Sequence, residues 1–174
     1  MGRNTKIFQI VGYQNSGKTT LITNLLAKGA SLGKRIGTIK HHGHGGVPST
    51  SIPSKDSDHH LKAGAALSGV AGEGALLLQL PAQEWQLDTL LQLYQLFAFD
   101  LILIEGFKLA PHPKAVLLRQ QQDLILLEQL DHIQAVISRF PLPQNVVSSS
   151  IPVFKIDECS IFIQWFYQTY LLNK

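Results

Sequence analysis

Two hydrophobic patterns alternate along this chain. Short runs of consecutive aliphatic or β-branched residues indicate buried strands, whereas longer segments with apolar side chains three and four positions apart indicate helices. Two strands joined by a helix should be parallel, with a right-handed crossover. The predicted strands are 6–11, 35–39, 65–71, 74–80, 101–104, 114–119, 133–137 and 153–154, and the predicted helices are 19–28, 56–64, 83–97 and 158–172, with a partly helical segment at 120–130.

A glycine-rich loop, GYQNSGKT at residues 12–19, separates the first predicted strand from the first predicted helix. A loop that turns into a helix N-terminus points several unpaired N–H groups at one place, which is what a phosphate chain requires. Gly12 and Gly17 let the backbone approach the phosphates. Lys18 is placed to reach the β- and γ-phosphates, and the Thr19 hydroxyl to bind a Mg²⁺ ion shared with them. The loop therefore predicts a nucleotide-phosphate site.

Composition limits the fold and the partners. With 174 residues, 45% of them hydrophobic, the chain suits one domain, and we expect a single P-loop nucleotide-binding domain over residues 1–174. The element order predicts an α/β protein, a three-layer P-loop NTPase fold with a mainly parallel central sheet flanked by helices. A net charge of +3, with only 16% of residues charged, favours an anionic small ligand and not nucleic acid. The lone Cys159 cannot form an internal disulfide.

The predicted strand 101–104 has four consecutive large aliphatic residues, which is typical of a strand covered on both faces. Glu105 follows it at the carboxyl edge, where P-loop proteins place an acid that holds the Mg²⁺ shell or positions a water. Asp100 should lie at the opposite end. Lys40 follows strand 35–39 at the same edge as Glu105, which is where open α/β sheets bind ligands.

The chain resembles the MobB proteins of molybdenum-cofactor synthesis, which bind GTP and assist the enzyme that makes molybdopterin guanine dinucleotide. The glycine loop is shared by a whole superfamily, whereas the other three matching blocks are more specific. Together they span about the first two thirds of the chain in the right order. The four blocks are VGYQNSGKTT at 11–20, GTIKHH at 37–42, KDS at 55–57 with His60 and AGA at 63–65, and DLILIEGFK at 100–108.

The resemblance implies a parallel α/β P-loop domain that forms homodimers, with GTP and Mg²⁺ as cofactors. Its partners would be the molybdenum cofactor guanylyltransferase (MobA type) and molybdopterin. A nucleotide site is implied at Gly12, Asn15, Ser16, Gly17, Lys18, Thr19, Thr20, Lys40, His41 and His42, with Lys18 and Glu105 catalytic and Thr19, Asp56 and Glu105 around the metal. The preference for guanine over adenine is implied by the resemblance alone, because the sequence has no guanine-reading Asn/Thr-Lys-x-Asp motif. Ser138-Arg139, after the strand 133–137, matches that motif only in position.

Five of the seven histidines lie between positions 41 and 60. This segment suits contacts to a phosphate-bearing pterin or its carrier, but zinc or nickel ligation and a solvated loop are alternatives. We read residues 41–55 as a long loop over the site. No apolar run approaches the roughly 18 residues that span a bilayer, so we expect a cytoplasmic protein that does not bind membranes.

The first functional interpretation is an adaptor with weak GTPase activity. Phosphoryl transfer needs positioning and charge neutralisation, and a cationic finger adds about 10³-fold or more. Arg119 and Arg139 are candidates at the ligand edge, whereas Arg35 should lie at the wrong edge. The alternatives are a small-molecule kinase or ATP-dependent ligase on the same fold, and a nickel-delivery type metallochaperone GTPase.

Overall fold

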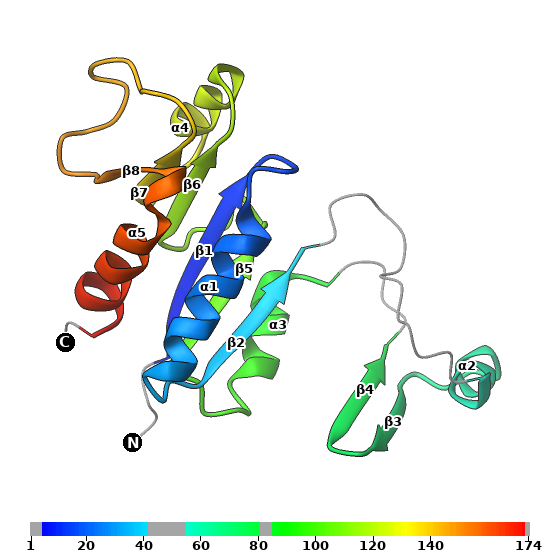
Figure 1. Ribbon diagram of the computed structural model, residues 1–174. Helices are drawn as coiled ribbons and strands as arrows, with labels where there is room; N and C mark the ends of the chain where they lie inside the picture. The colour runs from blue at the N-terminus through cyan, green and yellow to red at the C-terminus, as the bar shows by residue number, and fades with distance from the viewer. Residues whose placement is uncertain (1–4, 42–54, 81–84, 173–174) are drawn as a thin grey trace.

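The computed structural model describes residues 5–41, 55–80 and 85–172. Its body is a parallel sheet of six strands in the order β2-β5-β1-β6-β7-β8 (Figure 1). Each strand coincides with a predicted one to within about two residues. The strands are β1 (Lys6–Gly12), β2 (Ile36–Lys40), β5 (Leu101–Glu105), β6 (Lys114–Leu118), β7 (Ile133–Ser138) and β8 (Val153–Lys155).

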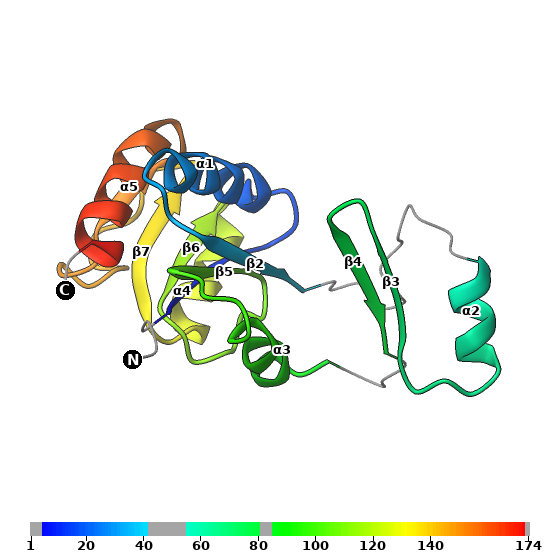
Figure 2. The ribbon, with the colours of Figure 1, turned by 90° about the horizontal axis from the view of Figure 1, so that it is seen from below.

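Helices cover both faces of this sheet, so the predicted three-layer P-loop α/β fold is confirmed (Figures 1 and 2). Because side chains alternate along a strand, Leu101 and Leu103 of β5 pack towards α1 and α5. Ile102 and Ile104 of the same strand pack towards α3. The helices are α1 (Lys18–Ser31), α2 (Lys55–Lys62), α3 (Leu87–Tyr94), α4 (Ile125–Gln129) and α5 (Cys159–Trp165), with short helical turns η1 (Gln121–Leu124), η2 (Ile156–Glu158) and η3 (Phe166–Leu171).

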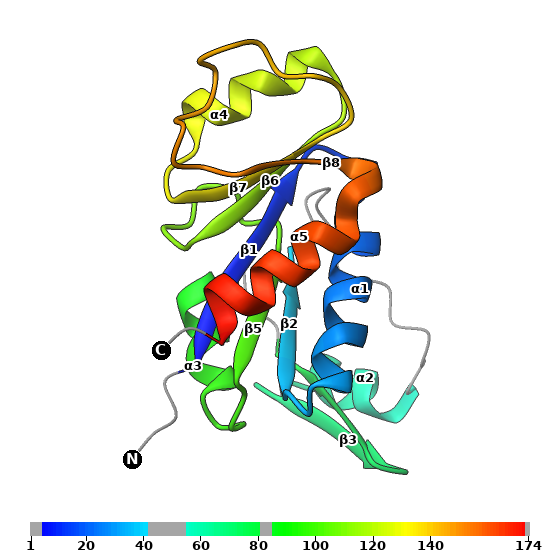
Figure 3. The same cartoon turned by 60° about the vertical axis from the view of Figure 1, so that its left-hand side comes forward.

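The strand order brings β2 and β5 together. Strands β1 and β2 are joined by α1 and are parallel, but β5 lies between them and pairs with both. The carboxyl ends of β1, β2 and β5 therefore meet at one edge. Figure 3 shows α1 and α5 side by side over the same face, and both contribute to one apolar cluster.

A small unit made of α2, β3 (Ser68–Gly72) and β4 (Ala75–Gln79) lies to one side of the body in Figures 1 and 2. The two strands form the predicted antiparallel hairpin around Glu73 and Gly74, both of which have positive φ. We call this unit the arm. Within the described ranges, none of the helices has the length and apolar character needed to cross a membrane.

The helical spacing of apolar residues predicts a packing face on each of two helices, with Trp85 and Phe97 on the helix 83–97 and Ile161 on the helix 158–172, and these three positions need correction. In the segment predicted as helix 83–97, helix α3 is shorter, and Trp85 and Phe97 are 40% and 49% exposed. In the C-terminal helix Ile161 is 53% exposed, whereas Tyr167 is buried and donates a 2.6 Å hydrogen bond to Leu25 O. Helical geometry changes to π at Phe166, which rotates the side chains that follow, Tyr167 among them, relative to α-helical spacing. Ile161 precedes this change and lies on the exposed side of α5.

Candidate functional site

The glycine loop joins β1 to α1 at the carboxyl edge of the sheet. Asn15 and Gly17 have φ values of 60° and 100°, so the loop turns sharply before the helix begins at Lys18. Gly17 is the N-cap and makes no side-chain capping bond, and the first turn of α1 carries no acidic residue. Because the first N–H groups of a helix have no intrahelical partner, this end of α1 favours an anion.

The loop is shaped for close backbone approach. A Cβ at Gly12 would lie 2.6 Å from Ser16 Oγ and 2.8 Å from Leu117 O. Within the described part of the chain, the buried Ser16 hydroxyl has no hydrogen-bond partner. An orphaned hydroxyl beneath a tight loop of backbone amides fits a bound phosphate chain. The donors here match those that a nucleotide polyphosphate requires.

Lys18 lies inside this loop. Its ammonium group donates a 2.7 Å hydrogen bond to Tyr13 O. Burial lowers the pKa of Lys18, the Glu105 carboxylate raises it, and the nearby Lys108 and Lys40 lower it again. Cations close enough to lower the pKa of Lys18 indicate a place where an anion is favoured.

Thr19, Lys40 and Glu105 meet beside the loop. Thr19 Oγ1 donates to the two carboxylate oxygens of Glu105 at 3.2 and 3.3 Å. Lys40 Nζ lies 3.3 Å from Glu105 Oε1, and the two residues are opposite each other in the β2–β5 ladder. The carboxylate is therefore fixed next to the hydroxyl that would bind Mg²⁺. A hydroxyl and a carboxylate oxygen are donors that suit this ion.

These groups line an open cleft of about 1310 Å³. Among its described lining residues, Glu105 is the one acid. The cations of the lining are Lys18, Lys40, Lys108 and Arg139. A cleft with this excess of positive charge suits a polyphosphate.

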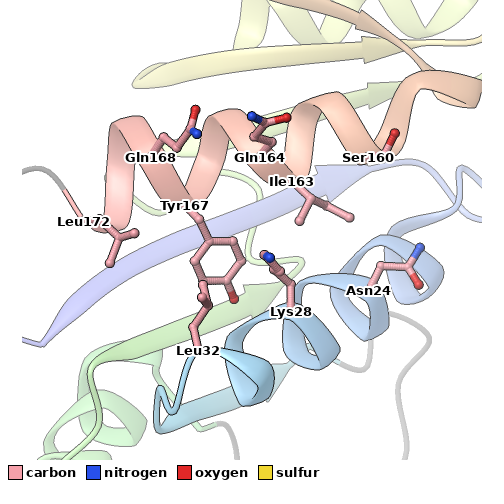
Figure 4. Close-up of a pocket in the computed structure, with 9 residues that line it drawn as sticks. All are labelled: Asn24, Lys28, Leu32, Ser160, Ile163, Gln164, Tyr167, Gln168 and Leu172. Atoms are coloured by element: carbon pink, nitrogen blue, oxygen red, sulfur yellow. The ribbon is translucent and has the colours of Figure 1, made fainter.

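A second hollow of about 670 Å³ lies between α1 and α5 (Figure 4). Leu32, Ile163 and Leu172 contribute apolar surface, and Lys28 is the one charged group among its described lining residues. It contains neither the glycine loop nor Glu105. The residues predicted to bind phosphate therefore lie at the cleft of the sheet edge and not at this hollow.

The other predicted site residues divide between the cleft and the arm. Thr20 and His41 line the cleft, and the His41 ring lies 4.5 Å from that of Phe107. Asp56 is exposed in the first turn of α2, in the arm, and does not line the cleft. Its predicted role at the metal stays a prediction. His42 lies outside the described residues.

The predicted arginines fall as follows. Arg119 Nη1 donates to Gln14 O at 3.5 Å, and Arg139 Nη2 lies 4.0 Å from the Cβ position at Gly17. Both are thus at the ligand edge, as predicted. The amide of Arg35 binds Asp100 at the opposite edge. Across residues 5–41, 55–80 and 85–172, no group of three or more His, Cys, Asp or Glu side chains could hold a metal ion.

Sequence reasoning missed three residues near the cleft. Gln9 and Lys114 are buried polar side chains in β1 and β6, and Lys108 follows Glu105 in the cleft lining. For Gln9 the visible signal was a polar residue inside an apolar strand, since a buried polar group is costly unless it is hydrogen-bonded.

The family model for Molybdopterin guanine dinucleotide synthesis protein B, MobB, matches residues 7–139. The chain belongs to the MobB family. The "Probable molybdopterin-guanine dinucleotide biosynthesis adapter protein" of Bacillus subtilis strain 168 is 45% identical over 153 residues, which cover 87% of this chain and 86% of the relative. The Escherichia coli K12 adapter protein is 33% identical, over 80% of this chain and 82% of its own length.

Solved MobB structures share the fold of this MobB-family chain. The crystal structure of Bacillus subtilis MobB superposes with a TM-score of 0.77 at 38% identity and covers 94% of this chain and 96% of that one. The MobB homologue from Bacillus stearothermophilus gives a TM-score of 0.74 at 36% identity, over 93% of this chain and 95% of that one. Family membership and fold are thus established together.

Proposed function

We propose that this protein is a GTP-binding adapter with weak GTPase activity that assists the attachment of GMP to molybdopterin. The observation that carries the proposal is the glycine loop with its orphaned Ser16 hydroxyl beside the fixed Thr19–Glu105 pair. Relatives across most of the chain are named molybdopterin-guanine dinucleotide biosynthesis adapter proteins, which supports the pathway.

The chain's own residues supply binding and orientation. Lys18 exchanges its bond to Tyr13 O for the β- and γ-phosphates, and the first amides of α1 hold the chain of phosphates. Mg²⁺ bound at Thr19 would neutralise charge on the phosphates. Glu105, held by Lys40, orients a water. We expect slow turnover because this set of residues includes no cationic finger, which would add about 10³-fold or more.

Titration calorimetry with GTP and with ATP, both in the presence of Mg²⁺, tests the nucleotide. We expect tighter binding of GTP, abolished in Lys18→Ala with an unchanged circular dichroism spectrum. Equal or tighter ATP binding would favour a kinase or ligase instead. Unchanged affinity in the variant would remove the loop from the site.

We propose the guanylyltransferase of MobA type as the protein partner. Synthesis of molybdopterin guanine dinucleotide by that enzyme, measured with and without this protein, tests the adapter role. Stimulation lost in Lys18→Ala is the expected result, and no stimulation by the wild-type protein contradicts the proposal.

We assign the molybdopterin contact to the histidine segment that begins at His41, which is exposed at the mouth of the cleft. Replacing His41 and His42 together by alanine should leave the GTP affinity near normal and impair transfer. Normal transfer would leave this segment without a role in the reaction.

We propose a homodimer formed through the arm. Leu76 and Leu78 lie two positions apart on one face of β4 and are 63% and 44% exposed. On the other face Ser57 of α2 donates to Gln79 at 3.5 Å, so α2 covers that side. A two-stranded hairpin with one open apolar face is marginal alone, which supports burial against a second copy.

Sedimentation velocity tests this interface. Leu76→Asp should shift the protein from dimer to monomer. Leu96→Asp is the matched control, because Leu96 is 77% exposed outside the arm. A monomeric wild type, or a dimeric Leu76→Asp variant, would contradict the interface.

A further inference from the structure

The loop after Glu105 has an unusual backbone. Gly106 and Phe107 have consecutive positive φ values of 92° and 49°. For a bulky residue such as Phe107 this conformation costs about 1–3 kcal/mol and persists only where the surroundings hold it. It also brings Gly106 against His41, since a Cβ at Gly106 would lie 3.0 Å from His41 Cβ. The loop is therefore held by its neighbours.

Two buried side chains from the sheet hold the loop that follows Glu105. Gln9 Nε2 donates to Gly106 O at 3.0 Å and to Phe107 O at 2.9 Å. Lys114 Nζ donates to Lys108 O at 3.1 Å and to Ala110 O at 2.9 Å.

Gln9 and Lys114 are 0% and 1% exposed and lie opposite each other in the β1–β6 ladder. They form one clamp beneath the loop. Buried donors are costly unless they are bonded, so the carbonyl positions of the loop are strongly specified.

The clamped loop presents Lys108 to the cleft. Its Nζ lies 4.3 Å from the centroid of the Tyr13 ring, above the glycine loop. Glu105, the acid of the described cleft lining, is already bonded to Thr19 and Lys40. A cation over a tyrosine ring gains about 0.5–2 kcal/mol, depending on how far the pair is desolvated. A phosphate oxygen would be a stronger partner.

We propose that Lys108 is a second cationic ligand for the phosphate chain bound at the glycine loop, and that Gln9 and Lys114 are the positioning residues that hold it there. The proposal rests on the proposed nucleotide binding. It adds to that function a cation from the loop that follows β5, on the side of the glycine loop where Tyr13 begins the turn.

The first test is the affinity for GTP with Mg²⁺ in Lys108→Ala, Lys108→Arg and the wild type. A lost charged hydrogen bond should weaken binding by about 10- to 100-fold. Arginine should retain most of the affinity. Lys62→Ala on the exposed side of α2 is the matched control, since it removes the same charge away from the cleft.

The second test concerns the clamp. Gln9→Met keeps the length of the side chain and removes its donors, and its fold is checked by circular dichroism. If Gln9 acts through Lys108, the double variant Gln9→Met with Lys108→Ala should bind GTP no more weakly than Lys108→Ala alone. A purely structural role would give additive losses and would overturn the assignment of Gln9.

The outcomes separate this inference from the proposed function. No GTP binding by the wild type would refute the function itself. Binding that is lost in Lys18→Ala but unchanged in Lys108→Ala would leave the function standing and overturn the role of Lys108. An equal loss in Lys62→Ala would also overturn it, because the effect would then come from net charge.

Discussion

Gly12→Ala tests whether the glycine loop must lie against β6. Gly12 is paired with Leu117, and an added Cβ would meet Ser16 Oγ at 2.6 Å and Leu117 O at 2.8 Å. The Ser16 hydroxyl can rotate away, but Leu117 O is fixed in the ladder. Carbon–oxygen contacts normally lie near 3.3 Å or beyond, so the loop must move by about 0.5 Å.

The magnitude follows from this displacement. Overpacking of this kind costs about 1–3 kcal/mol, which for a chain of this size lowers the melting temperature by about 2–12 °C. Phosphate-binding amides displaced with the loop should weaken GTP binding by at least about tenfold, since one charged hydrogen bond contributes about 1.5–3 kcal/mol.

Thermal unfolding and titration calorimetry with GTP measure the two effects. Gly33→Ala is the control, because Gly33 has a φ of 65° but no atom within 4 Å of its Cβ position. It should lose about 1–2 kcal/mol from backbone strain and keep its GTP affinity. A Gly12→Ala protein with normal melting and normal affinity would refute the tight approach of the loop.

Three further predictions concern hydrolysis, packing and pH. Glu105→Gln should slow GTP hydrolysis at least about tenfold and change the Kd for GTP less; normal turnover would remove Glu105 from the mechanism. Gly29→Ala should destabilise the fold in urea although alanine favours helices by about 1 kcal/mol, because its Cβ would overlap the Ile36 side chain and lie 2.5 Å from Tyr167 Oη. Tyr167→Phe added to it should recover part of the loss. Burial lowers the pKa of His112 from 6.5, so the unfolded chain takes up its proton first and stability should fall as the pH drops below 6.5. Melting temperatures at pH 7.5 and 5.5 should differ less in His112→Gln, and an equal difference would contradict this assignment.

Much of the site could be predicted from local sequence. The glycine loop, strand β5 and Glu105 follow from patterns within a few residues, because each depends on a short run and its direction in the sheet. To predict that Lys40 contacts Glu105, the strand order must be known as well. That order places β5 between β1 and β2, and it depends on long-range pairing that no local pattern encodes.

The faces of the helices were predicted less well. In the C-terminal helix the sequence spacing assumed 3.6 residues per turn throughout, whereas the turn from Phe166 is π-helical. Tyr167 thereby enters the core. Burial raises the pKa of Tyr167 to about 12, so its hydroxyl remains a donor to Leu25 O. A polar tip with a backbone partner is compatible with burial, and periodicity alone does not reveal it.

The hydrogen-bond partners of Gln9 and Lys114 near the cleft could not be predicted from the sequence either. Gln9 interrupts the apolar run of β1, and Lys114 begins the apolar strand β6. Both strands are buried on both faces, so each side chain needs a hydrogen-bond partner inside the protein. The sequence indicates that such partners exist but not which atoms they are. The β1–β6 register places both side chains under one loop, where they bind four carbonyl groups. A buried polar residue in a strand of a parallel sheet is therefore a reason to examine the loop that its side chain binds, because those hydrogen bonds fix the backbone of the loop and with it the side chains that the loop presents.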